Sequence, residues 1–260
     1  MKVVILAGGM GTRLREETEF RPKPMVEIGG IPILWHIMKI YSHYGFKEFI
    51  LCLGYKGEYI RRYFLDYHLM NCDITLSLGS ERGVQLHHFH EEMDWKVTLA
   101  DTGAKSQTGF RIKQIEKYLG DDKDFMLTYG DGVADVDIHK LIDFHRQHGR
   151  VATVTGVHPA SRWGELLVDG DEVQQFREKP QLNEGVINGG FFVLDRRVFD
   201  YIDDNPDMPF EREPMGKLAE DRQLMVYRHD GFWYAMDTLR DTTLLNEMWK
   251  SPAPPWKVWS

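Results

Sequence analysis

The sequence has few cysteines, no long apolar run and no excess of positive charge. Its 2 cysteines, Cys52 and Cys72, cannot form a disulfide framework and do not form a CxxC pair, which indicates a reducing compartment. No segment reaches the roughly 20 apolar residues of a membrane-spanning helix. The apolar start MKVVIL runs into GGMGTR, where a signal peptide would have a small-residue cleavage site. These absences predict a cytoplasmic protein with no membrane partner.

The formal net charge of -8 narrows the range of partners. A field of this sign repels polyanions, so the composition argues against nucleic acid as a partner, and an anionic ligand has to be held by local cations. No sequence period of roughly 20–50 residues is present, so a repeat architecture is not indicated. We expect one domain over residues 1–260. Its Pro- and Trp-rich end, residues 250–260, is expected to pack irregularly on the body or on a neighbouring subunit.

Short apolar runs alternate with stretches of helical periodicity. Runs that are apolar at every position are typical of strands buried on both faces of a parallel sheet. Residues 33–45 and 137–149 have apolar positions at helical spacing, and each stretch ends in glycine. The alternation predicts an α/β fold with a doubly wound sheet. The apolar runs are residues 3–7, 48–54, 124–130, 151–157 and 189–195.

The middle of the chain has a different pattern. Residues 73–78 and 84–90 alternate apolar and polar positions around a Gly-containing turn, which predicts a small antiparallel β-ribbon near residues 73–90. The segment HHFHEEMDW offers a candidate zinc site, but its spacing is not diagnostic, and we favour a solvated or subunit-interface face. The candidate ligands in it are His88, His90, Glu91 and Glu92.

A glycine-rich loop, AGGMGTR, directly follows the first predicted strand. Parallel sheets bind ligands beyond the carboxyl ends of their strands. Gly8, Gly9 and Gly11 allow backbone N–H groups to approach an anion without interference from a Cβ atom. The dinucleotide fingerprint GxGxxG is not met, because Leu14 stands at the third glycine, and the GKS or GKT of a P-loop is absent. A solvated loop of tight turns is the alternative to an anion site.

Two cations follow the glycine loop. Arg13 lies within it, and Lys23 stands between Pro22 and Pro24, which restrict the backbone around it. A rigidly held lysine close to an arginine suits a triphosphate. The sequence therefore predicts that this loop holds nucleotide phosphates.

Two aspartates are candidate metal ligands. Asp131 ends a predicted buried strand between two glycines, on the same sheet edge as the glycine loop, and Asp237 follows an aromatic and apolar run. One or two carboxylates together with substrate phosphates are the usual ligands of Mg²⁺. A turn residue is the alternative for each. Asp135 and Asp241 are weaker candidates, because each can equally be a helix cap or a surface charge.

A second polar cluster follows the predicted ribbon. Lys179 stands before Pro180 in REKP, as Lys23 stands before Pro24, and suggests a second anionic substrate. Asn188 precedes two glycines and can hydrogen-bond a polyol hydroxyl, although Asn-Gly is also an ordinary hairpin turn.

Together these blocks resemble the sugar-1-phosphate nucleotidylyltransferases. The resemblance rests on LAGGMGTRL with its downstream KP, the strand-end GD, the EKP and the later aspartate. It extends over essentially the whole chain and is stronger for the cytidylyl-transferring branch of the family. The blocks that carry this are RPKPMVEIGGIPILWHIMKIYSHYG, LCLGYKGEYI, VTLADTG, SQTGFR, TYGDGVADVDI, INGGFFVL, GFWYAMDTLRD and APPWKVW.

The resemblance implies a Rossmann-like, mixed but mostly parallel sheet, the nucleotide-diphospho-sugar transferase fold. It implies Mg²⁺-assisted transfer of the cytidylyl group of CTP to α-D-glucose 1-phosphate, for deoxysugar and O-antigen-type polysaccharide synthesis. The chain departs from the family pattern in SQTGFR and in HPASRWGELL, which leaves the sugar open. It also implies a homo-oligomer, a hexamer. Thymidylyl, uridylyl or guanylyl transfer, a noncatalytic regulatory subunit and a nicotinamide dehydrogenase are the alternatives.

The resemblance also assigns site residues. Those implied to act in catalysis are Arg13, Lys23, Asp131 and Lys179. Mg²⁺ is expected on Asp131 and Asp237, and the sugar phosphate on Glu178, Lys179 and Asn188. The residues implied to bind the nucleotide are Leu6, Ala7, Gly8, Gly9, Met10, Gly11, Thr12, Arg13, Lys23, Ser106, Arg111 and Gly130.

Overall fold

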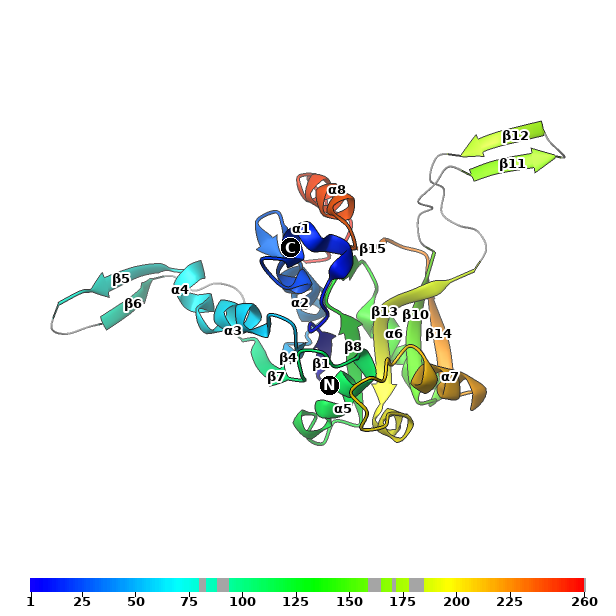
Figure 1. Ribbon diagram of the computed structural model, residues 1–260, viewed down its shortest axis with the longest axis horizontal. Coiled ribbons are helices and arrows are strands. Elements are labelled where there is room, and N and C mark those ends of the chain that lie inside the picture. Colours follow the sequence, from blue (N-terminus) through cyan, green and yellow to red (C-terminus); the bar gives the residue numbers. More distant parts are fainter. Residues whose placement is uncertain (80–82, 88–93, 159–164, 170–171, 178–184, 260) are drawn as a thin grey trace.

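A mixed sheet of seven strands forms the centre of the molecule (Figure 1). The computed structural model describes residues 1–79, 83–87, 94–158, 165–169, 172–177 and 185–259. The strand order is β14-β10-β13-β8-β1-β4-β7, and β1 lies parallel to β4 and β8. The strands are β1 (Val3–Leu6), β4 (Glu48–Leu53), β7 (Lys96–Asp101), β8 (Asp124–Tyr129), β10 (Ala152–Val157), β13 (Ile187–Asp195) and β14 (Leu224–His229). The five predicted apolar runs are thus all strands of this sheet.

Strand β13 differs from the expectation of a parallel strand. It runs antiparallel to both of its neighbours, β8 and β10. A parallel neighbour needs a crossover connection, usually a helix, whereas the described part of the connection from β10 to β13 is a hairpin. That hairpin consists of β11 (Glu165–Asp169) and β12 (Glu172–Arg177). The edge strands β7 and β14 were not predicted, because they are only partly buried and lack a continuous apolar run.

Helices cover both faces of the sheet, which confirms the doubly wound arrangement. Successive residues of β1 alternate between two buried clusters, with Val3 and Ile5 in one and Val4 and Leu6 in the other. The first cluster includes residues of α2, α6 and α8, and the second includes residues of α5 and α7. The helices are α1 (Arg15–Thr18), α2 (Ile33–His43), α3 (Gly57–Leu65), α4 (Tyr67–Asn71), α5 (Thr108–Gln114), α6 (Ile138–His148), α7 (Glu213–Glu220) and α8 (Leu239–Trp249).

Short elements complete the described chain. The small strands pair as two ribbons, β2 with β3 and β9 with β15. Their bounds are β2 (Glu27–Ile28), β3 (Ile31–Pro32), β9 (Gly132–Ala134) and β15 (Trp233–Ala235). The 3₁₀ helices are η1 (Thr12–Leu14), η2 (Lys23–Met25), η3 (Glu116–Tyr118) and η4 (Arg196–Tyr201). The first begins within the glycine-rich loop, and the second follows that loop in sequence and carries Lys23.

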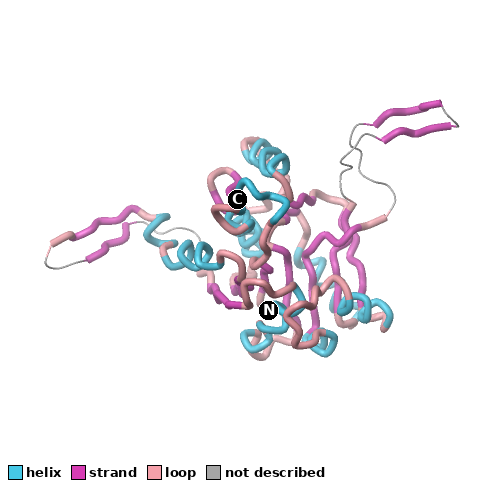
Figure 2. The backbone as a smooth tube through the Cα atoms, viewed as in Figure 1, coloured by secondary structure: helices cyan, strands magenta, loops and turns pink. Residues whose placement is uncertain are grey.

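Two hairpins project from opposite sides of the sheet (Figure 2). One is the predicted antiparallel ribbon, formed by β5 (Asp73–Ser77) and β6 (Gly83–His87), and the other is β11–β12. All residues of β5 are exposed, so its alternating pattern does not mark a buried face in this chain. Most of the histidine and glutamate cluster at 87–95, including His88, His90, Glu91 and Glu92, lies outside the described residues.

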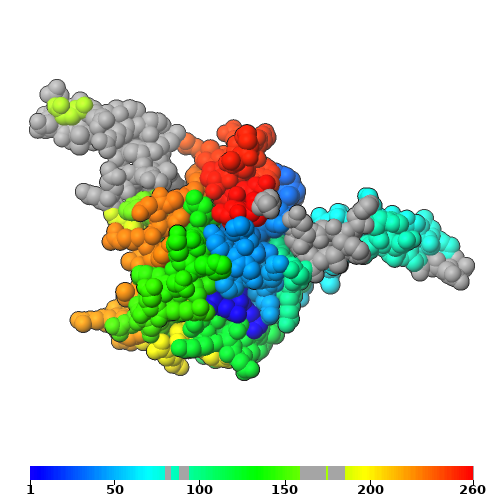
Figure 3. All heavy atoms as spheres, turned by 180° about the vertical axis from the view of Figure 1, so that it is seen from behind, coloured from blue at the N-terminus to red at the C-terminus, as the bar shows by residue number. Residues whose placement is uncertain are grey.

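The C-terminal tail packs on the body without helix or strand over residues 251–259 of the described chain. Figure 3 shows these residues, in red, against N-terminal residues in blue. Trp256 is fully buried and stacks between Phe232 and Trp249, with ring centroids 5.8 and 6.0 Å away. Among the helices of the described residues, none has the length and apolar character that crossing a membrane requires.

Candidate functional site

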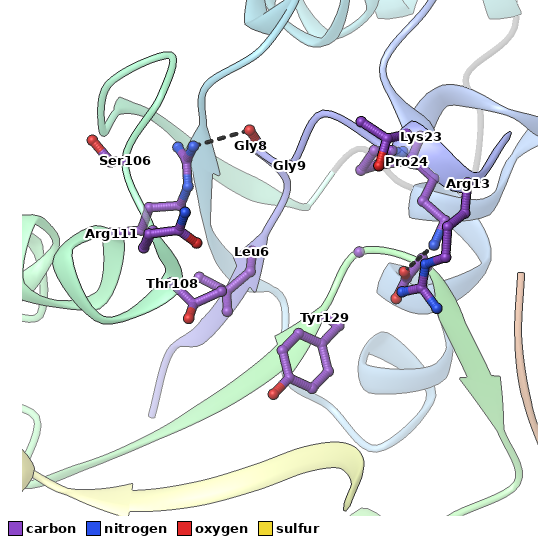
Figure 4. A pocket seen from close by; sticks show the side chains of 15 residues that line it. Leu6, Gly8, Gly9, Arg13, Lys23, Pro24, Ser106, Thr108, Arg111 and Tyr129 are labelled. Atoms are coloured by element: carbon purple, nitrogen blue, oxygen red, sulfur yellow. Dashed lines mark hydrogen bonds and ion pairs between the residues drawn. The ribbon is translucent and has the colours of Figure 1, made fainter. Parts of the chain in front are cut away.

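An open pocket of about 270 Å³ lies beyond the carboxyl ends of β1 and β8. Figure 4 shows Arg13 and Lys23 on one side of it, and Ser106 and Arg111 on the other. The lining includes every residue predicted to bind the nucleotide except Ala7, which is buried in the core, and Met10, whose side chain is exposed. The full lining is Leu6, Gly8, Gly9, Gly11, Thr12, Arg13, Lys23, Pro24, Ser106, Gln107, Thr108, Arg111, Tyr129, Gly130 and Asp131.

Lys23 joins the two predicted metal ligands. Its Nζ lies 2.5 Å from Oδ2 of Asp131 and 2.6 Å from Oδ1 of Asp237. Burial lowers the pKa of Lys23, but the charges and hydrogen bonds of the two carboxylates outweigh burial and raise it above its ordinary value. Lys23 is therefore a permanent cation, and three segments distant in sequence meet at its ammonium group.

Arg13 completes this charge cluster from the glycine loop. Its Nη1 donates to Oδ2 of Asp237 at 2.8 Å, and 71% of its side chain is exposed. An exposed ion pair of this kind is weak, so it costs little to move Arg13 from the carboxylate to a phosphate. Lys23 is the fixed cation of the site, and Arg13 is the cation free to reorient.

The position of Asp237 is set by Asp241. Oδ2 of Asp241 accepts hydrogen bonds from the backbone N–H groups of Asp237 and Thr238, at 3.0 and 2.8 Å. With Thr238 it forms the capping box of α8, and Tyr234 donates to its other oxygen at 2.9 Å. Burial raises the pKa of Asp241, but these hydrogen bonds outweigh burial and lower it below its ordinary value. Asp241 is thus a helix cap, one of the two alternatives that the sequence left open.

Asp135, the other weak candidate, pairs with His229 instead of facing the pocket. Its Oδ1 lies 2.9 Å from Nε2 of His229. This contact joins the segment after β9 to the end of β14.

Gly130 fixes the distance between Lys23 and Asp131. A Cβ atom at Gly130 would lie 2.9 Å from Cγ of Pro24 and 2.9 Å from the carbonyl oxygen of Leu6. Both contacts are too short, so only glycine allows η2 to pack on the end of β8. The two prolines beside Lys23 and the glycine before Asp131 therefore place the cation against the carboxylate.

Arg111 supports the glycine loop from behind. Its guanidinium is buried and donates to the carbonyl oxygens of Gly8 and Leu53, at 2.9 and 3.0 Å. A Cβ atom at Gly8 would come within 2.1 Å of this group, so Gly8 makes room for an internal cation. Burial lowers the pKa of Arg111. Its predicted contact with the base and ribose remains a prediction, and its role in joining the ends of β1 and β4 has no signature in the sequence.

The donor set at Lys23 fits Mg²⁺. One oxygen of Asp131 and one of Asp237 lie within 2.6 Å of the same cationic nitrogen, Nζ of Lys23. The two carboxylates are therefore already arranged around a positive charge, as they would be around a metal ion. Carboxylate oxygens are hard ligands of the kind that Mg²⁺ takes, with phosphates and water completing its shell.

The predicted sugar-phosphate side is only partly within the described chain. Glu178 and Lys179 lie outside the described residues. Asn188 is the second residue of β13, and its Nδ2 donates to Oη of Tyr129 at 3.1 Å. Tyr129 in turn donates to Glu211 at 2.8 Å. Sequence reasoning missed Tyr129 and Glu211. Tyr129 could have been found from its position directly before Gly130 and Asp131, whereas no sequence pattern marks Glu211.

A mostly parallel sheet with a glycine loop, two cations and two carboxylates at its carboxyl edge is the arrangement expected of a nucleotide-handling enzyme. The family of nucleotidyl transferases matches residues 2–247, and the chain belongs to this family.

Relatives narrow the class further. The chain is 52% identical to "Glucose-1-phosphate cytidylyltransferase" of Salmonella typhi over 259 residues, which cover 100% of both chains. It is 48% identical to "Probable glucose-1-phosphate cytidylyltransferase" of Bacillus subtilis, again over 100% of both. Among solved structures, HddC from Yersinia pseudotuberculosis complexed with GMP-PN is similar with a TM-score of 0.69 at 26% identity, over 96% of this chain and 99% of that chain.

Proposed function

We propose that this chain transfers the cytidylyl group of CTP to the phosphate of α-D-glucose 1-phosphate, forming CDP-glucose and releasing pyrophosphate. The observation that carries the proposal is the 52% identity to a glucose-1-phosphate cytidylyltransferase over the full length of both chains. The Lys23–Asp131–Asp237 cluster supports the proposal, because such a transfer needs a cation for the phosphates and carboxylates for a metal ion.

In the proposed reaction an oxygen of the sugar phosphate attacks the α-phosphorus of CTP in line. A P–O bond forms on one side, and the bond to pyrophosphate breaks on the other, so the protein needs no covalent nucleophile. Two polyanions repel each other on approach, and catalysis is therefore mostly positioning and neutralisation of charge. In a chain of net charge -8 this neutralisation has to come from individual cations.

The cations of the glycine loop have separate tasks in this scheme. Lys23 is nearly buried and held by two carboxylates, so it fixes where the triphosphate lies. Arg13 is exposed and moves from Asp237 to the pyrophosphate, where negative charge develops as the bond breaks. Lys179 aligns the phosphate of the sugar, as the resemblance to the family implies.

Asp131 and Asp237 are the residues that would hold Mg²⁺. The bound ion would supply stabilisation of the charge on the phosphates, which is worth several kcal/mol in metal-assisted transfer. The carboxylates themselves keep Lys23 protonated and in place until the nucleotide enters.

The proposal extends to the setting of the enzyme. We place the enzyme in the cytoplasm, in agreement with two cysteines that are both free thiols. Its product would supply CDP-sugar for the synthesis of deoxysugars and O-antigen-type polysaccharides. We also propose a homo-oligomer, a hexamer. Large apolar side chains exposed at and near the β5–β6 ribbon support association, namely Leu65, Met70, Leu76 and Leu78.

The test is pyrophosphate release by the purified protein with Mg²⁺, with each nucleotide and each hexose 1-phosphate supplied singly. CTP with glucose 1-phosphate is expected to give the highest kcat/KM. Higher kcat/KM with dTTP, UTP or GTP would reject cytidylyl transfer, and higher kcat/KM with another hexose 1-phosphate would reject glucose. Nucleotide binding with no pyrophosphate release for any pair would favour a regulatory subunit.

A further inference from the structure

Glu211 links two walls of the pocket. Its Oε2 accepts a hydrogen bond from Oγ1 of Thr108 at 2.6 Å, and its Oε1 accepts one from Oη of Tyr129 at 2.8 Å. Thr108 begins α5 on the wall next to Ser106, and Tyr129 ends β8 next to Asp131. A single carboxylate therefore joins the side expected to hold the nucleotide to the side expected to hold the sugar.

The loop that carries Glu211 is fastened to the start of α5. The backbone N–H groups of Gln107 and Gly109 donate to the carbonyl oxygens of Pro206 and Met208, at 2.8 and 2.9 Å. The N–H group of Phe210 donates to Oγ1 of Thr108 at 2.8 Å. Because the side chains of Met208 and Phe210 are also buried, Glu211 extends from a rigid segment although its own side chain is exposed.

The hydrogen-bond chain through Tyr129 has a defined direction. The hydroxyl group of Tyr129 donates to Oε1 of Glu211 at 2.8 Å, because a carboxylate oxygen can only accept. Its oxygen then accepts from Nδ2 of Asn188 at 3.1 Å, while Oδ1 of Asn188 accepts from the N–H group of Gly190 at 2.9 Å. These contacts fix which end of the Asn188 amide is nitrogen and leave its second N–H for a ligand.

The backbone close to Asn188 is strained, and this strain helps to set the orientation of the Asn188 side chain. Phe191 has φ of +32°, a value rare for a bulky residue, and its fully buried ring stacks on Tyr41 with centroids 5.8 Å apart. The pairing of β13 with β10 shifts register at this point, between Val154 and Gly156. Such a bulge re-aims the residues beside it, and strain of this kind collects at functional sites.

We propose that Glu211 is a positioning residue for the sugar-phosphate substrate. Anchored by Thr108, it holds the Tyr129 phenol, and the phenol orients the Asn188 amide so that its remaining N–H donates to a hydroxyl group of the sugar. The inference rests on the proposed function, because it concerns the acceptor side of that same site. It adds a specificity-determining chain, Glu211 to Tyr129 to Asn188, in which only Asn188 touches the substrate.

Steady-state kinetics of Glu211→Gln, Tyr129→Phe and the double variant test this chain. Each single variant is expected to raise the KM for glucose 1-phosphate about tenfold, with the KM for CTP within about twofold of wild type, since one hydrogen bond to a charged group is lost. The double variant is expected to be no worse than the more affected single one, because both break the same chain. Glu213→Gln, on exposed α7, is the matched control and leaves both KM values unchanged.

Equal increases of both KM values, or additive effects in the double variant, would overturn the proposal, as would an unchanged KM for glucose 1-phosphate. Calorimetric titration of glucose 1-phosphate into wild type and Glu211→Gln separates this inference from the proposed function. Tighter binding by wild type, with no CDP-glucose formed, would refute only the function. Normal CDP-glucose synthesis by wild type, with equal binding by both proteins, would refute only the role of Glu211.

Discussion

The ammonium group of Lys23 lies between Asp131 and Asp237, 2.5 Å from one carboxylate oxygen and 2.6 Å from the other. Lys23 therefore occupies the place between the two predicted metal ligands. Nucleotide phosphates attract Lys23 while the metal attracts the carboxylates, so we expect the nucleotide and the metal to enter this cluster together.

Replacement of Lys23 by methionine is expected to change the two affinities in opposite directions. Without the ammonium, the carboxylates repel each other and bind a free divalent cation more tightly, while the triphosphate loses its fixed positive partner. We expect Mn²⁺ to bind about tenfold more tightly in the absence of nucleotide, and CTP about tenfold more weakly. Calorimetry or the paramagnetic signal of Mn²⁺ measures this, with exposed Lys117→Met as control. Weaker binding of both would contradict the arrangement.

The variant Asp131→Asn is expected to fold but to lose at least about 100-fold in kcat, since it removes a charge from the site where phosphate charge is stabilised. Lys23 keeps Asp237 as its partner, so the free energy of unfolding should fall by no more than about 2 kcal/mol. Product formation and denaturant unfolding are measured in parallel, with exposed Asp143→Asn as control. Near-normal CDP-glucose synthesis would show that Asp131 is not a metal ligand.

Two buried histidines predict how stability depends on pH. Burial lowers the pKa of His36 from 6.5 to about 4, and burial together with the charge of His148 lowers the pKa of His145 from 6.5 to about 4. The unfolded chain takes up these protons below pH 6.5 and the folded chain does not. Their contribution to stability is therefore present above pH 6.5 and is lost as the pH falls from 6.5 to about 4.

Denaturant unfolding between pH 5 and 6, a range well inside this window, measures the slope. Each histidine adds up to about 1.4 kcal/mol per pH unit. His145→Gln keeps a polar partner for Thr153 and should reduce the slope by up to about 1.4 kcal/mol per pH unit. His43→Gln, at an exposed position, is the matched control. A slope that is the same in wild type and His145→Gln would contradict the assignment to His145.

The C-terminal tail is predicted to contribute strongly to stability. Trp256 is fully buried, and its Nε1 donates to Nδ1 of His36 at 3.4 Å. Trp256→Ala is expected to lower the free energy of unfolding by about 3–5 kcal/mol, because it leaves a large cavity among aromatic rings. Lys257→Ala, at the exposed neighbour, should change it little. Equal stability of the two variants would show that the tail does not pack as described.

The sequence was most informative where the local pattern and the sheet rule agree. The apolar runs identified β1, β4, β8, β10 and β13, and the rule that ligands bind at the carboxyl ends of parallel strands brought the glycine loop, Lys23 and Asp131 to one edge. Asp237 was a candidate from its place after an aromatic and apolar run, and the resemblance to a family then assigned it to Mg²⁺. The structure places it within reach of both Lys23 and Arg13.

Other features depend on packing between distant segments and have no local signature. The direction of β13 follows from its connection to β10, because the apolar run is compatible with either direction. Gly8 suggested only an anion site, whereas the buried guanidinium of Arg111 also needs the space beside it. Glu211 is one of many charged residues in a loop, and only the docking of that loop on α5 brings it to Tyr129.

Competition between nucleotides tests the central claim most directly. The wild-type protein is incubated with glucose 1-phosphate, Mg²⁺ and equal concentrations of CTP, UTP, dTTP and GTP, and the products are identified by mass. Cytidylyl transfer predicts CDP-glucose as the main product, and none when Mg²⁺ is chelated. UDP-, dTDP- or GDP-glucose as the main product would contradict the claim.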